Sequence, residues 1–183
     1  MKTIWIQVLA WLGAVTVALL LALAAPNEST LMGRMPAVNA KRLNQQPIAL
    51  PQGLPAGRTL ALVAFNRGHR GEIESWIKGM QLRENDAIAW LKIPVLDDPG
   101  TDLARSEIES GILARHSALV DRSRLVPVFT NREAFMRAAG MSGIDHAWVL
   151  VIGRDGQVLA RVEGEYSEEK GQALRETLLA QGF

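Results

Sequence analysis

A short charged stretch after an apolar run holds the residues best suited to chemistry. The stretch NRGHRGEIESW, residues 66–76, places two arginines and a histidine among glycines, namely Arg67, His69 and Arg70. Arginines are permanent cations, and the amide groups at the start of a helix attract anions, so these residues could bind an anion or a carboxylate. Glu72 and Glu74 begin the same predicted helix and oppose an anion. We therefore favour a solvated turn over a binding site for a small ligand, and contact with a protein remains open.

Asp145 and His146 form a second candidate stretch, directly before another apolar run. With His69 they could hold a metal ion or support hydrolysis, and a periplasmic enzyme or ligand-binding domain that uses this edge is our alternative function. The histidines lack the spacing of a metal site, and Ser75 lacks the Gly-x-Ser-x-Gly context of a nucleophile. We therefore expect no catalytic residue, no metal and no cofactor. The candidates for partner binding are Arg67, His69, Arg70, Asp145 and His146.

The composition excludes several classes of function. The chain has 183 residues and no cysteine, so disulfides, thiolate metal sites and thiol redox chemistry are excluded. Its net charge is +1, and no basic stripe is visible, which argues against nucleic acid as a partner. With 48% hydrophobic residues the chain is long and apolar enough for one domain with a sizeable core.

The first segment differs from the rest of the chain. Residues 4–25 carry no charge and are long enough to cross a bilayer as a helix. A cleaved signal peptide, which would release a soluble periplasmic domain, is the alternative, but its apolar run is typically only about 7–15 residues long. We therefore expect residues 1–25 to be an anchor or signal segment, with the anchor favoured. The expected location is the bacterial inner membrane, with a single pass and the domain facing the periplasm.

The remaining chain divides into a linker and a domain. Residues 26–57 contain five of the eight prolines and are predicted to be a Pro-rich linker and lead-in. Residues 58–183 are predicted to form a mixed sheet flanked by helices, in the order β-α-β-α-β-α-β-β-α. The expected strands span residues 59–66, 88–96, 124–130, 147–152 and 158–162. The expected helices span 72–83, 101–116 and 131–139, with a last one after Ser167; the second should face the core through Leu103, Ile108 and Ile112.

This order, with the segment GMSGIDHAWVLVIGRDGQVLARVEGEYSEEKGQALRETL, resembles the second half of a thioredoxin-like domain. The resemblance places the redox cysteines of that fold within residues 67–71, where this chain has none, and Asp145 stands where the neighbouring proline would be. The stretches LVAFNRGHRGEIESWI and IPVLDD are similar to a narrower, membrane-linked family without redox cysteines. That family includes the mitochondrial inner-membrane assembly factor for F-type ATP synthase subunit a. It implies a non-catalytic, membrane-anchored protein that binds a protein partner at the membrane and assists assembly of a membrane complex, with ATP synthase as one candidate.

Overall fold

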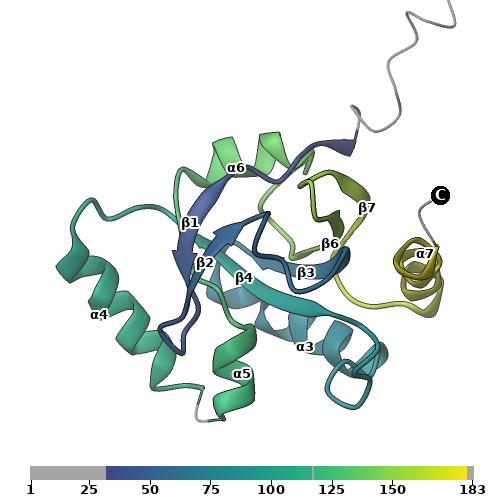
Figure 1. The fold of residues 1–183 in the computed structure, drawn as a ribbon, viewed down its shortest axis with the longest axis horizontal. Coiled ribbons are helices and arrows are strands. Elements are labelled where there is room, and N and C mark those ends of the chain that lie inside the picture. Colours follow the sequence, from purple (N-terminus) through teal and green to yellow (C-terminus); the bar gives the residue numbers. More distant parts are fainter. Residues whose placement is uncertain (1–31, 117, 181–183) are drawn as a thin grey trace, which may run out of the picture. The chain divides into compact units, whose positions relative to one another are not determined.

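Five strands form the central sheet, in the order β5-β4-β3-β6-β7 (Figure 1). The structure is a computed structural model that describes residues 32–116 and 118–180. Strand β4 runs parallel to both β3 and β5, whereas β6 runs antiparallel to both β3 and β7. The sheet is therefore mixed, as expected. The strands are β3 (Arg58–Ala64), β4 (Trp90–Leu96), β5 (Val128–Phe129), β6 (Trp148–Gly153) and β7 (Val158–Glu163).

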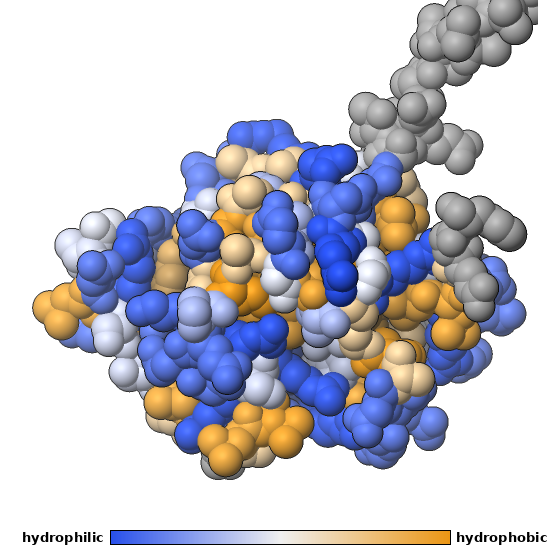
Figure 2. All heavy atoms as spheres, viewed as in Figure 1, coloured by the Kyte–Doolittle hydropathy of each residue, from blue (hydrophilic) through white to orange (hydrophobic). Residues whose placement is uncertain are grey.

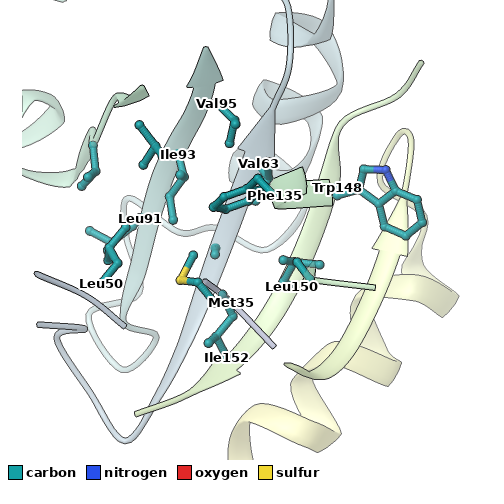
Figure 3. Packing of buried hydrophobic residues seen from close by; sticks show 14 of the residues in the cluster. Met35, Leu50, Val63, Leu91, Ile93, Val95, Phe135, Trp148, Leu150 and Ile152 are labelled. Atoms are coloured by element: carbon teal, nitrogen blue, oxygen red, sulfur yellow. The ribbon is translucent and has the colours of Figure 1, made fainter. Parts of the chain in front are cut away.

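The two faces of the sheet are covered by different elements. Helices α3 (Arg70–Gly79) and α7 (Glu168–Leu179) bury their apolar sides on one face, with Trp76 of α3 fully buried there. Helix α6 (Arg132–Ala138) covers the other face and contributes Phe135 to the cluster seen in Figure 3. Strands that are apolar on both sides suit such a layered arrangement, because both faces of the sheet are removed from water.

A hairpin before the sheet extends the domain towards the N-terminus. Strands β1 (Val38–Lys41) and β2 (Pro47–Leu50) pair antiparallel, and side chains such as Met35 and Leu50 enter the core (Figure 3). The compact unit begins at Met32. Residues 32–57, expected as linker and lead-in, thus belong to the folded domain, and its boundary lies earlier than residue 58. The prolines delimit the hairpin strands here, and the alternating apolar side chains between them cover the sheet.

Turn and capping residues in the sequence predicted where several helices and strands begin or end. The turn after β6 has Gly156 at φ +88°, a conformation that favours glycine in an Asp-Gly hairpin turn. Ser167 caps α7 by accepting a hydrogen bond from the backbone N–H of Lys170 at 3.3 Å. Strand β5 is a short edge strand, where Pro127, which has no backbone N–H to donate, is tolerated just before it. Helix α5 (Leu119–Arg124) was not predicted from the sequence.

Helix α4 (Asp102–Leu113) corrects one expectation. Thr101, the first residue of the predicted helix, caps α4, but no residue of α4 is buried, and Leu103 and Ile108 are 74% and 37% exposed. The prediction that they face the core was wrong, because β5 has only two residues and the sheet ends before it can offer α4 an apolar surface. Figure 2 shows apolar surface at the margins of the molecule over α4 and α5.

The expected membrane anchor lies outside the described residues. Within residues 32–116 and 118–180, no helix is both long and apolar enough to span a bilayer. The anchor formed by residues 4–25 therefore stays a prediction.

Candidate functional site

The buried side chain of His69 stabilises the turn between β3 and α3. The residue is only 3% exposed. The backbone N–H of Phe65 donates to Nδ1 at 3.3 Å, so we assign the ring proton of the neutral imidazole to Nε2. With that proton, Nε2 donates to the carbonyl oxygen of Asp145 at 3.1 Å, and it also lies 2.9 Å from Nδ2 of Asn66. Both ring nitrogens are therefore engaged, and the imidazole joins the turn after β3 to the loop before β6.

Burial changes the role predicted for His69. We expected an exposed candidate for partner binding, but neither ring nitrogen is available to a partner or a metal ion. The side chain of Asn66 supports the same turn, because its Oδ1 accepts a hydrogen bond from the N–H of Gly68 at 2.8 Å. His69 thus holds in place the edge of the sheet where β3 ends and β6 begins, and it is not part of the exposed surface there.

Glu72 forms a second connection between the same two segments. It lies in the first turn of α3, and its Oε1 accepts a hydrogen bond from Nδ1 of His146 at 2.8 Å. Its Oε2 accepts a hydrogen bond from the backbone N–H of Ala147. The sequence analysis considered Glu72 only as a charge opposing an anion and missed this pairing. An acid in the first turn of a helix beside a histidine-containing loop is the signal that could have indicated it.

The Glu72–His146 contact shifts both protonation equilibria. The hydrogen bond to Glu72, and then its negative charge, raise the pKa of His146. Partial burial acts to raise the pKa of Glu72, but the hydrogen bonds from His146 and Ala147 and the charge of His146 together lower it. The contact therefore favours the charged forms of both side chains.

The two arginines lie on the outside of the turn. Arg67 and Arg70 are both exposed, and neither guanidinium group has an ion pair or hydrogen bond with any residue in the described ranges. Burial, followed by the positive charge of Lys92, lowers the pKa of His116, and Arg70 adds a smaller contribution in the same direction. Arg70 is thus close enough to His116 for its positive charge to act on that ring.

Asp145 contributes its backbone to the site and exposes its side chain. The structure therefore brings all five candidates to one edge, where β3 ends and β6 begins. His69 is hydrogen-bonded at both ring nitrogens, and its Nε2 faces the backbone carbonyl of Asp145. Within the described part of the chain, no three histidine, aspartate or glutamate side chains converge as a metal site.

A third arginine at this edge was missed by the sequence analysis. Arg132, at the start of α6, pairs with Asp97 at 2.7 Å and donates to the carbonyl of Phe65 at 3.3 Å. It therefore joins the ends of β3 and β4. Only the folded chain brings Asp97 and Arg132 together, and no local motif marks this pair.

The Ser75-Trp76 pair of the predicted helix has a packing role. Ser75 Oγ accepts a hydrogen bond from the N–H of Tyr166 at 3.0 Å, and Trp76 Nε1 donates to the carbonyl of Gly164 at 2.8 Å. Both contacts hold the segment between β7 and α7 against α3. Ser75 is half-buried and takes part in this packing contact.

Comparison of the fold with solved structures identifies it as thioredoxin-like. A putative electron transfer protein from Aquifex aeolicus VF5 matches with a TM-score of 0.56 at 13% identity, over 82% of this chain and 95% of that one. BsSco, a member of the Sco family of cytochrome c oxidase assembly proteins, matches with a TM-score of 0.53 at 13% identity, over 82% and 96%. The exposed lipoprotein thioredoxin Etrx1 of Streptococcus pneumoniae matches with a TM-score of 0.50 at 10% identity, over 78% and 98%.

These similarities extend to the fold alone, because the identities are low. No protein-family model matches the sequence, and no curated protein is significantly similar to it. The expected thioredoxin-like mixed sheet is confirmed. The narrower resemblance to the ATP synthase assembly factor is not tested by these neighbours and stays a prediction.

Proposed function

We propose that this chain is a non-catalytic, membrane-anchored thioredoxin-like protein that binds a protein partner and assists the assembly or stability of a membrane complex. One observation carries the proposal. In the turn where the resemblance places the redox cysteines, the chain has a buried histidine whose ring is hydrogen-bonded to the facing loop. A reactive thiol must be accessible to exchange, whereas the imidazole of His69 holds the turn closed. The edge is thus built as a fixed surface for recognition.

The membrane part of the proposal is supported by the uncharged segment 4–25. The proposed location is the bacterial inner membrane, with a single pass and the domain in the periplasm. The fold neighbour BsSco belongs to a family of cytochrome c oxidase assembly proteins, which supports an assembly role for this fold. ATP synthase is one candidate complex, on the narrower sequence resemblance alone.

The test is site-specific photo-crosslinking of the full chain in native membranes. A photoreactive residue replaces Asp145, which is exposed at the candidate edge. The matched control replaces Arg154, which is also exposed and lies in the turn after β6. The two positions lie at opposite ends of the sheet, because Arg58 pairs with Gly153 and Val63 pairs with Trp148. Crosslinked partners are identified by mass spectrometry.

The expected result is an adduct from position 145, but not from position 154, with one subunit of a membrane complex. Native electrophoresis should also show that this complex is depleted in cells that lack the chain and restored by the full-length protein. Equal adducts from both positions, or no adduct together with normal membrane complexes in the deletion strain, would contradict the proposal.

A further inference from the structure

The charges at the candidate edge are unevenly paired. Glu72 already accepts hydrogen bonds from the loop before β6, and Asp97 already pairs with Arg132 at 2.7 Å. Among the described residues, Arg67 and Arg70 have no acidic partner. Two permanent cations therefore remain on the exposed side of the turn, while Glu72 and Asp97 pair with other groups.

The spacing of these arginines directs them to the same side. Arg67 begins the short 3₁₀ turn Arg67–His69, and Arg70 begins α3. Residues three apart in a helical turn are neighbours on its surface. Each guanidinium group can bind a carboxylate through two parallel hydrogen bonds, so the pair suits a ligand with successive carboxylates. Asp145, on the loop that His69 joins to this turn, is an exposed acid whose charge would repel such a ligand.

Gly71, next to these arginines, is not required by the fold. Its backbone is not in the left-handed region, and a Cβ added there would meet no atom within 4 Å. A glycine inside a helix weakens the helix relative to alanine, so folding alone favours a different residue at this position. Glycine does allow another backbone to approach closely. Gly111 in α4 has the same open surroundings but no unpaired arginine pair beside it, which makes it a matched control.

We propose that Arg67, Arg70 and Gly71 form a binding surface for an acidic, extended segment of the partner protein. The guanidinium groups pair with carboxylates of this segment, and Gly71 admits its backbone. The inference rests on the proposed function and adds the chemistry of the partner to it.

The test measures binding of a fluorescent octaglutamate peptide to the full chain in detergent micelles, by fluorescence anisotropy at low ionic strength. An octalysine peptide is the control for charge. Replacing both arginines with glutamine (R67Q with R70Q) should weaken octaglutamate binding by about tenfold, because two exposed ion pairs are lost. Asp145→Asn should strengthen binding. Arg154→Gln, at the far end of the sheet, should leave it unchanged.

The two glycine variants separate recognition from stability. Gly71→Ala should raise the melting temperature and still weaken octaglutamate binding, whereas Gly111→Ala should raise the melting temperature and leave binding unchanged. Octaglutamate binding that survives the double arginine substitution, or that Gly71→Ala does not alter, would overturn the inference.

The crosslinking experiment distinguishes this inference from the proposed function. If position 145 crosslinks to a partner through a segment without acidic residues, the proposed function stands and the acidic surface is wrong. If octaglutamate binding behaves as expected but position 145 yields no partner and membrane complexes are normal, the acidic surface stands and the assembly role is wrong.

Discussion

Replacing His69 with alanine tests the central structural claim, that the imidazole joins the turn after β3 to the loop before β6. The substitution removes two hydrogen bonds of a side chain that is almost fully buried. It leaves the N–H of Phe65 and the carbonyl of Asp145 without these partners. The variant should therefore lose stability, and the two segments should separate locally.

The magnitude follows from the groups left unpaired. A buried donor or acceptor without a partner costs about 1–3 kcal/mol, so two such groups together give about 3 kcal/mol if water satisfies them in part. For a domain of this size, 1 kcal/mol shifts the melting temperature by about 2–4 °C, so His69→Ala should lower it by about 6–12 °C. This is a large part of the total stability of about 5–15 kcal/mol that is typical of folded proteins.

The assay combines urea denaturation of the full chain in micelles with hydrogen exchange of single amides. Exchange at the Phe65 amide should accelerate more than exchange at amides inside β6, because His69 protects that N–H directly. His146→Ala provides the control, since His146 lies at the same edge with its side chain 58% exposed and should cause a smaller loss. A loss in His69→Ala below about 1 kcal/mol, or unchanged exchange at Phe65, would refute the reasoning, because one unpaired buried group alone costs that much.

Further predictions concern the Glu72–His146 pair, the packing of Gly79 and the exposure of α4. Glu72→Gln should lower the pKa of His146 towards its usual value in an NMR titration, because Glu72 raises it. The stability contributed by His146 should be fully present below the ordinary histidine pKa of about 6.5 and be lost as pH rises through the higher pKa of the folded state. The stability contributed by Glu72 should be fully present above the ordinary glutamate pKa of about 4.3 and be lost as pH falls through the lower pKa of the folded state. A profile of stability that does not change with pH would contradict this. Gly79→Ala should destabilise the domain by about 1–3 kcal/mol in urea denaturation, because the added Cβ would clash with the ring of Tyr166. An unchanged stability would exclude that packing. Leu103→Ser should change the stability by less than about 0.5 kcal/mol because Leu103 is exposed, whereas Ile93→Ala should cost about 2–5 kcal/mol because Ile93 is buried. Equal losses of stability would place α4 in the core.

Local patterns predicted the elements of the domain well, because each pattern reports on neighbouring residues. The apolar runs placed β3, β4 and β6, and the hydroxyl groups of Thr101 and Ser167 placed the starts of α4 and α7. The same patterns failed at α4, whose apolar residues suit a covered helix. Whether such a helix is covered depends on the length of the sheet beside it, and β5, with two residues, is too short to cover α4.

The candidate site shows the same division. The sequence alone determined that thiol chemistry is impossible, since the chain has no cysteine, and it located the residues of both stretches of the edge. The tertiary structure decided which of them are accessible. It buried His69 by pairing it with Asp145 across 76 positions of sequence, engaged Glu72 with His146 across 74, and left Arg67 exposed. Pairing between segments so far apart depends on the path of the whole chain, which is why no local pattern could predict it.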